Sequence, residues 1–355
     1  MSTANESQFP PRLHNEVYPF IYPKKFQGSL HDKVTIITGA AGTIGKALAE
    51  CFAVAGAKLV LVYNRTRPSL EFEARCASLG ARGVTLIQCN VADLEGCKSL
   101  VAQVVDTEGK VDILINNAGA NSLGPVSLRY SRHGAITVKL TIPNHQKMHL
   151  QDPEQFIQEF QVNFHGPYAL MRLLLPVFRE QRSGCILNIA SRAGTVDIPY
   201  SASYCSSKAA LINLTGCTQK EIDIDGLSDV NLYSLHPGGV KSEMTVKKYS
   251  DESLKKLPED GAKRFKGLLS PEGPYTDSPY LNGMVCVALA NGIAKDVLKG
   301  KYFDVGHDLE DVLAQSEAIK KDPELYSLHT TFLGGLSNLN ATERPNDKPF
   351  EFPGL

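Results

Sequence analysis

The sequence lacks the features that mark membrane proteins and nucleic-acid-binding proteins. No apolar run approaches the ~18–20 residues that a bilayer span requires. Lys and Arg number 37 and Asp and Glu 38, so the formal net charge is only -1 and no basic surplus exists for a nucleic acid. We therefore expect neither nucleic acid nor membrane among the partners.

The eight cysteines show no Cys-x-x-Cys spacing and no clustering with histidine, so we expect no metal site. The first 30 residues lack the charged-then-apolar layout of a secretory signal. A reducing compartment, and hence a cytoplasmic location, is the expectation.

What the chain does contain is a series of short apolar runs that alternate with stretches of helical periodicity. Strands are predicted at residues 33–38, 58–63, 84–89, 111–115, 185–189 and 230–235, and helices between them, for example at 44–55, 94–106 and 203–222. Near-continuous apolar strands separated by helices indicate a parallel sheet covered on both faces. The fold class is therefore α/β, a doubly wound parallel sheet of the Rossmann type in one domain.

Three segments look like additions to a core at residues 31–306. Residues 1–30 hold four prolines with aromatics between them and are expected to run extended over the surface. Apolar and polar residues alternate on both sides of a predicted turn at 131–134, which favours a β-hairpin inserted at about 121–151. In the extension at 307–355 a helix is expected over 308–321 and an extended end after it.

A glycine-rich turn follows the first predicted strand. Gly39, Gly42 and Gly45 lie between that strand and the next helix. Glycine permits a tight turn and a close approach of phosphates, which would meet amide groups at the helix N-terminus. The turn opens the first strand–helix unit of a long series, the context that a dinucleotide site requires.

Tyr204 and Lys208 are the most informative pair in the chain. Among the thirteen tyrosines only Tyr204 is followed by a lysine four residues later. That spacing places both side chains on one face of a helix. A neighbouring ammonium stabilises a phenolate, so we expect the lysine to lower the pKa of the tyrosine and to make it useful for proton transfer.

These motifs occur in the order found in the short-chain dehydrogenase/reductase family, which the chain resembles from about Gly28 to Gly306. The landmarks that carry the resemblance are Thr38-Gly39…Gly45, Asn116-Asn117-Ala118-Gly119, Asn163, Ser191, Tyr204-x-x-x-Lys208 and Pro237-Gly238-Gly239-Val240-Lys241-Ser242. The resemblance is to the compact one-domain branch of the family, here with N- and C-terminal extensions.

The resemblance implies a catalytic set of Asn163, Ser191, Tyr204 and Lys208. Tyr204 would be the general acid or base, and Ser191 would donate a hydrogen bond to the substrate oxygen. Lys208 would hold the nicotinamide ribose, and Asn163 would hold a water that links Lys208 to solvent.

The resemblance also implies a set of cofactor-binding residues. They are Gly39, Thr43, Ile44, Gly45, Asn64, Arg65, Asn90, Val91, Asn117, Ala118, Gly119, Tyr204, Lys208, Pro237, Gly238, Val240 and Ser242. Thr43 departs from the pattern, because the compact branch usually has a glycine there. Its hydroxyl could crowd the phosphates or donate to one.

The choice of nucleotide rests on the end of the second predicted strand. An acidic residue there would bind the ribose 2′-hydroxyl and repel a 2′-phosphate. None is present, whereas Arg65 and Arg67 could pair with a phosphate. We favour NADP(H), with NAD(H) as the alternative.

The sequence thus predicts an NADP(H)-dependent oxidoreductase that interconverts a ketone or aldehyde and an alcohol. Because the additions suggest specialisation, we expect a small-molecule substrate of secondary metabolism, and we expect the enzyme to be a homodimer or homotetramer. Two alternatives stay open. One is a non-redox isomerisation, elimination or cyclisation on the same fold, and the other is a protein that only senses the nucleotide.

Overall fold

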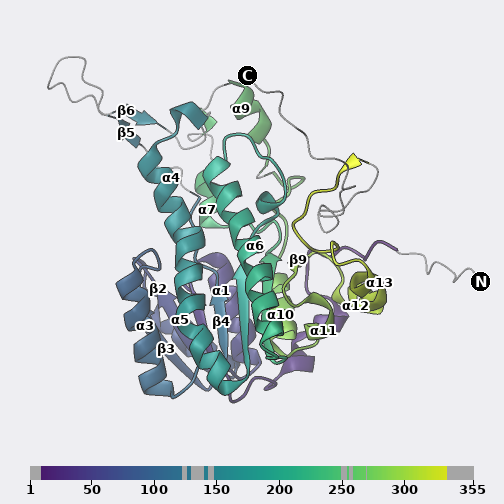
Figure 1. The fold of residues 1–355 in the computed structure, drawn as a ribbon. Helices are drawn as coiled ribbons and strands as arrows, with labels where there is room; N and C mark the ends of the chain where they lie inside the picture. The colour runs from purple at the N-terminus through teal and green to yellow at the C-terminus, as the bar shows by residue number, and fades with distance from the viewer. Residues whose placement is uncertain are drawn as a thin grey trace, which may run out of the picture.

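The computed structural model describes residues 9–121, 126–128, 140–142, 148–248, 254–255, 259–268 and 270–333. Its centre is a seven-stranded parallel sheet in the order β3-β2-β1-β4-β7-β8-β9 (Figure 1). The strands are β1 (Val34–Thr38), β2 (Lys58–Tyr63), β3 (Gly83–Gln88), β4 (Ile113–Asn116), β7 (Gly184–Ile189), β8 (Val230–His236) and β9 (Tyr302–Asp304). The predicted doubly wound α/β fold is confirmed.

Six of the seven strands lie within a few residues of their predicted positions. The seventh, β9, was not predicted, because it has only three residues and no apolar alternation. It pairs with the end of β8, with Ser234 opposite Tyr302.

Helices cover both faces of the sheet, as a fully apolar parallel sheet requires. Residues of β1 alternate between the two faces: Val34 and Ile36 pack with α3, α5 and α6, and Ile37 packs with α1, α2 and α10. The helices are α1 (Thr43–Val54), α2 (Leu70–Leu79), α3 (Leu94–Glu108), α4 (Pro153–Phe160), α5 (Gly166–Gln181), α6 (Ala202–Ile224), α7 (Glu243–Lys248), α9 (Glu259–Phe265), α10 (Pro279–Ala290), α11 (Lys295–Leu298), α12 (Leu309–Ala314) and α13 (Ser316–Lys321).

Helices α4 and α5 follow one another through a single π-helical turn, Gln161–His165. Helix α4 begins at Pro153, where the fixed φ of proline suits the first helical position, and the Asp152 carboxylate caps it by accepting a hydrogen bond from the Glu154 N–H at 2.9 Å. The π-turn places Asn163 on the side that faces α6.

The N-terminal segment differs from the expectation of an extended surface strand. Its described part forms two 3-10 turns, Pro19–Ile21 and Pro23–Phe26, each with proline at the first position. Tyr18, Ile21 and Phe26 are buried against α10 and its neighbours. Two of the aromatics of this segment, Tyr18 and Phe26, are therefore core residues, whereas Tyr22 is exposed.

This N-terminal segment also binds the C-terminal one. Arg12 donates to both carboxylate oxygens of Asp311 at 2.8 Å, and His14 Nε2 lies 2.7 Å from Asp308 Oδ2. Asp308 caps α12. The helix expected over 308–321 is present as two helices, α12 and α13, which are separated at Gln315. Beyond it, the Tyr326 carbonyl accepts a hydrogen bond from the Tyr302 N–H at the edge of the sheet.

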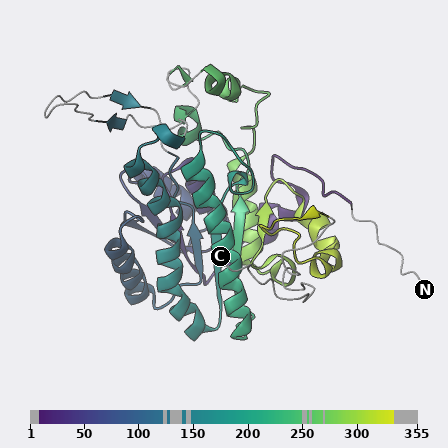
Figure 2. The same cartoon turned by 45° about the horizontal axis from the view of Figure 1, so that its top comes forward.

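The inserted hairpin is present as two short antiparallel strands, β5 (Val126–Leu128) and β6 (Leu140–Ile142), with Ser127 opposite Thr141. Its predicted turn at 131–134 lies outside the described residues. The hairpin follows the carboxyl end of β4, and α9 follows that of β8. Figures 1 and 2 show both at the same end of the molecule.

Candidate active site

Two adjoining cavities lie at the carboxyl ends of the strands, where open α/β sheets bind ligands. One, of about 380 Å³, is lined by Ser191, Tyr204 and Lys208, and we call it the tyrosine cavity. The other, of about 600 Å³, is lined by the glycine-rich turn, and we call it the glycine cavity. The residues that line both are Ile44, Asn117, Gly119, Ser242 and Met244. The two cavities therefore adjoin one another through these shared residues.

The glycine-rich turn can be built only with glycine at two of its positions. Gly39 has a φ of +65°, and a Cβ there would lie 2.9 Å from the Ala118 Cα. A Cβ on Gly45 would lie 2.2 Å from the Gly39 carbonyl oxygen. The turn therefore stays tight against the start of α1, whose N-terminal amides face the glycine cavity at Thr43, Ile44 and Gly45.

Thr38 joins this turn to the loop after β4. Its hydroxyl oxygen accepts hydrogen bonds from the Asn117 N–H at 2.9 Å and the Ala118 N–H at 3.0 Å. The Asn117 side-chain amide donates back to the Thr38 carbonyl at 2.8 Å. The boundary between the two cavities is thus fixed by backbone and side-chain hydrogen bonds.

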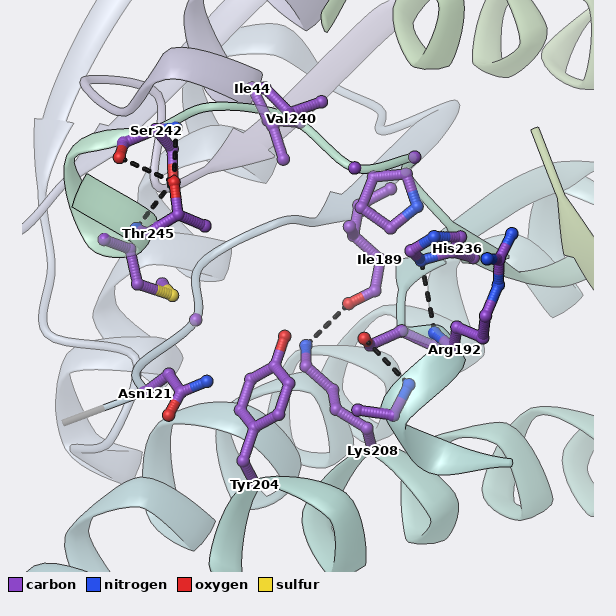
Figure 3. Close-up of a pocket in the computed structure, with 18 of the residues that line it drawn as sticks. Ile44, Asn121, Ile189, Arg192, Tyr204, Lys208, His236, Val240, Ser242 and Thr245 are labelled. Atoms are coloured by element: carbon purple, nitrogen blue, oxygen red, sulfur yellow. Dashed lines mark hydrogen bonds between the residues drawn. The ribbon is translucent and has the colours of Figure 1, made fainter. Parts of the chain in front are cut away.

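Lys208 is buried beside Tyr204 on α6. Its Nζ donates to the Ile189 carbonyl at 2.7 Å and lies 5.8 Å from the centroid of the Tyr204 ring (Figure 3). Burial lowers the pKa of Lys208 to about 8, because the charged form loses its hydration. The ammonium is thus poised to change its charge near neutral pH.

Tyr204 differs from the expectation in its acidity. Burial raises its pKa to about 12, and a hydrogen bond with Ser191 opposes this shift. The expected lowering by Lys208 is not among the causes of this shift, and the Lys208 ammonium donates to the Ile189 carbonyl instead. Tyr204 is therefore a protonated phenol at neutral pH.

Ser191 and Asn163 approach this pair from two other elements. Ser191 follows β7, lines the tyrosine cavity and accepts a hydrogen bond from the Ala193 N–H at 3.1 Å. The Asn163 side chain is fully buried and exchanges two hydrogen bonds of 2.8 Å with the backbone of Ala120. It also donates to the Ser207 hydroxyl at 3.2 Å. The water-holding role of Asn163 stays a prediction.

Most of the predicted cofactor residues line one or both cavities. Those that do are Gly39, Thr43, Ile44, Gly45, Asn117, Ala118, Gly119, Tyr204, Lys208, Pro237, Gly238, Val240 and Ser242. Asn64, Arg65, Asn90 and Val91 do not. Asn64 and Arg65 are exposed at the end of β2, beside Thr66, which does line the glycine cavity. Val91 is buried against Gly166.

Among the polar residues of these cavities that the sequence did not predict are Lys46, Arg192, His236 and Asp277. Burial lowers the pKa of His236 to about 4, so the ring is neutral. The Asp277 carboxylate accepts a hydrogen bond from the Gly239 N–H at 2.6 Å. Lys46 and Arg192 directly follow predicted residues in sequence, and His236 directly precedes one. Asp277 has no such neighbour.

The chain is similar to known proteins of one family over most of its length. The model of that family, described as short chain dehydrogenase, matches residues 33–253. A short chain dehydrogenase of Pseudocercospora fijiensis is 28% identical over 305 residues, which cover 84% of this chain and 88% of the relative. An 11-beta-hydroxysteroid dehydrogenase A of Sesamum indicum is 27% identical over 66% of this chain and 60% of its own length.

A solved structure supports the fold. The crystal structure of a Burkholderia xenovorans protein assigned to the short-chain dehydrogenases/reductases matches with a TM-score of 0.61 and 24% identity, over 78% of this chain and 96% of that one. The chain therefore belongs to the short-chain dehydrogenase/reductase family, whose members are oxidoreductases that use NAD(H) or NADP(H) on small molecules. Among the described residues, none of the helices combines the length and apolar character needed to cross a bilayer.

Proposed function

We propose that this protein interconverts a ketone or aldehyde and an alcohol, with NADP(H) as its nucleotide. The observation that supports this most is the convergence of Tyr204, Ser191 and Lys208 in one cavity that continues into the glycine cavity. A proton donor, a hydrogen-bond donor and a cation meet there, next to a turn shaped for phosphates. This arrangement suits a reaction in which an oxygen gains negative charge and then a proton.

The glycine cavity and its boundary fit a dinucleotide. Gly45 packs directly against the Gly39 backbone, which keeps the turn close to the start of α1, and Thr43, Ile44 and Gly45 line the cavity there. Asn117 and Gly119 would lie along the nucleotide where the cavities join, and Lys208 would hold the nicotinamide ribose. When bound, the nicotinamide donates a hydride to the carbonyl carbon or accepts one from the alcohol carbon.

The protein's own residues handle the proton. In reduction, Tyr204 donates its phenolic proton to the carbonyl oxygen, and its pKa of about 12 keeps that proton in place at neutral pH. Ser191 donates a hydrogen bond to the same oxygen. The Lys208 ammonium then stabilises the phenolate that remains, and Tyr204 is reprotonated from solvent.

The preference for NADP(H) rests on cations around the adenosine end of the site. The end of β2 has no carboxylate, and Arg65 is exposed there. Lys46 lines the glycine cavity together with Thr66, and its Nζ lies 5.9 Å from the centroid of the Phe72 ring. We expect Arg65 and Lys46 to bind the 2′-phosphate.

The test is the absorbance of the reduced nicotinamide at about 340 nm, with NADPH or NADH offered against a panel of ketones. We expect oxidation of NADPH, lowered in Tyr204→Phe by roughly 10²–10⁴-fold without a change in nucleotide affinity. Tyr22→Phe, a change at an exposed tyrosine of the N-terminal segment, is the matched control. Nucleotide binding without oxidation across the whole panel would contradict the proposal and favour a nucleotide sensor or a non-redox enzyme.

We also propose that the enzyme is a homo-oligomer. Phe156, Phe160 and Phe164 form a ladder along α4 and the π-turn, with ring centroids 6.0 and 5.7 Å apart. On the same continuous helix Ile157 and Tyr168 are 53% and 49% exposed. An apolar stripe of this kind suits a contact with a second copy.

The mass in solution tests this proposal. Ile157→Asp is expected to lower it towards the 38.6 kDa of one chain, and Leu70→Asp, at an exposed position of α2, is expected to leave it unchanged. A wild-type protein of 38.6 kDa at all concentrations would refute it.

All eight cysteines are free thiols, which supports a reducing, cytoplasmic environment.

A further inference from the structure

Arg192 occupies the edge of the tyrosine cavity, and the proposed proton transfer does not use it. It directly follows Ser191 and lines the cavity together with His236. Figure 3 shows its side chain on the outer side of the His236 ring, away from Tyr204 and Lys208 and across the cavity from Asn121. A cation in this position bears on what the cavity binds.

The guanidinium of Arg192 is held rigidly. Its Nε and Nη2 both donate to Asp304 Oδ2, at 3.2 and 2.6 Å. Asp304 is buried at the end of β9, and its other oxygen accepts a hydrogen bond from the Gly306 N–H at 3.0 Å. The backbone N–H of Arg192 donates to His236 Nδ1 at 3.2 Å. An arginine fixed at both ends loses little conformational freedom when it binds a ligand.

Donors remain on the outer edge of the same guanidinium. Two of its five N–H groups go to Asp304, and the other three have no partner among the residues that the structure describes. The side chain is 64% exposed. The edge formed by Nη1 and Nη2 presents parallel donors that match the two oxygens of a carboxylate.

Arg192 is the cation at this edge of the cavity. His236 is neutral because burial lowers its pKa to about 4. The Asp277 carboxylate accepts a hydrogen bond from the Gly239 N–H, and Lys208 lies at the reacting end. Part of the remaining wall is apolar, from Ile198, Val240, Met244 and Pro274, and part is polar, from Asn121, Ser201 and Thr245. The cavity therefore combines a polar reacting end, a mixed wall and a fixed cation at one edge.

We propose that Arg192 determines specificity by binding a carboxylate, so that the substrate is an oxo acid with its carbonyl at Tyr204 and its carboxylate at Arg192. Asp304 is then a positioning residue that acts through Arg192. The carbonyl part of this proposal rests on the proposed function, whereas the carboxylate part can be tested without turnover.

The first test measures binding through the melting temperature of the NADP⁺-saturated protein. Linear carboxylates from butanoate to octanoate are compared with the amides of the same acids. We expect the carboxylates to raise the melting temperature and the amides not to, and Arg192→Met to lose the effect. Arg179→Met removes another arginine–aspartate pair, with Asp225, and is expected to keep it. Equal shifts for acids and amides, or an undiminished shift in Arg192→Met, would overturn the proposal.

The second test separates specificity from structure. Because Arg192→Met leaves the buried Asp304 without its cation, the double variant Arg192→Met/Asp304→Asn is measured beside it. In both, we expect kcat/KM for an oxo acid to fall about 10- to 100-fold, mainly through KM, and that for its methyl ester to stay unchanged. Asp304→Asn alone is expected to raise the acid's KM less. An equal fall for acid and ester would show a structural role instead.

Failure of the two proposals can be told apart. A protein that binds carboxylates through Arg192 but reduces no carbonyl compound refutes the proposed function and leaves the anion site in place. A protein that reduces neutral ketones, with Arg192→Met equally active on acids and esters, refutes only the anion site.

Discussion

The glycine cavity and the tyrosine cavity are built in different ways. The first is shaped by backbone: Gly39 and Gly45 leave no room for a side chain, and Thr38 ties their turn to the loop after β4. The second is shaped by side chains from separate segments, among them Arg192, His236 and Asp277. A cavity shaped by backbone tolerates few substitutions at its glycines, whereas the ligand of a cavity shaped by side chains can change when those side chains are substituted. We infer that the nucleotide is fixed by the fold and the substrate by these side chains.

The largest effect is expected at Gly45, which tests whether close backbone packing shapes the glycine cavity. In Gly45→Ala the new Cβ would lie 2.2 Å from the Gly39 carbonyl oxygen, so the turn must move. We expect nucleotide affinity to fall more than about 100-fold and the free energy of unfolding to fall by about 2–4 kcal/mol. Titration calorimetry and urea unfolding measure the two.

Gly42→Ala is the matched control. A Cβ there would lie 3.5 Å from the same oxygen, an ordinary contact, and the φ of -76° suits any residue. Its free energy of unfolding is expected to stay within about 1 kcal/mol of wild type. Equal losses in the two variants would show that close packing at Gly45 does not shape this cavity.

Arg65 is one of the two side chains, with Lys46, that we propose bind the 2′-phosphate and so select NADP(H). In Arg65→Ala we expect KM for NADPH to rise about tenfold and KM for NADH to stay unchanged, because only NADPH has the 2′-phosphate. Arg67→Ala is the control, since Arg67 is held near Glu73 at 3.4 Å. A rise in both KM values would indicate a general effect on the site.

The dependence of kcat/KM on pH tests whether the charge of Lys208 is needed for nucleotide binding. Lys208 is charged below its pKa of about 8 and neutral above it. Because kcat/KM for NADPH reports the free enzyme, we expect it to fall about tenfold per pH unit above pH 8. His236, whose pKa is lowered to about 4, cannot account for such a limb. A flat profile from pH 7 to 10 would mean that the charge of Lys208 is not needed for nucleotide binding.

The smallest expected effect concerns stability. Lys208 is a buried cation whose Nζ donates to the Ile189 carbonyl, and burial lowers its pKa from 10.5 to about 8. Folding therefore opposes its charge, a cost that is full below pH 8 and disappears as pH rises to 10.5. We expect Lys208→Met to be inactive yet more stable by about 1–2 kcal/mol at pH 7, and less so at pH 10. Thermal unfolding at both pH values measures this, and a destabilised variant at pH 7 would contradict it.

The sheet could be predicted from sequence because buried parallel strands are near-continuous apolar runs. The strands β1, β2, β3, β4, β7 and β8 were predicted on that pattern, whereas β9 is three residues long and pairs with the end of β8. The N-terminal segment was misjudged for a related reason. Prolines at 19 and 23 suggested an extended chain, but they begin 3-10 turns that bury Ile21 and Phe26. Only tertiary packing decides between those two outcomes.

The site residues likewise divide into those that local sequence patterns predict and those that only the tertiary structure brings together. Tyr204 and Lys208 were found through their spacing of four residues and Ser191 through the resemblance to the family, and the structure brings all three into one cavity. The Arg192–Asp304 pair joins residues 112 positions apart, so no local pattern announces it. The raised pKa of Tyr204 was also missed, since sequence spacing does not reveal how deeply a phenol is buried.

The contact between Tyr302 and Tyr326 bears on solubility. β9 is the outermost strand of the sheet, and an uncovered edge strand is a template on which other chains can aggregate. The Tyr326 carbonyl accepts the Tyr302 N–H on that edge, and Arg12 and His14 hold the start of the same C-terminal segment in place. The two terminal segments thus occupy part of the outer edge of β9 and leave less of it open to pairing with another chain.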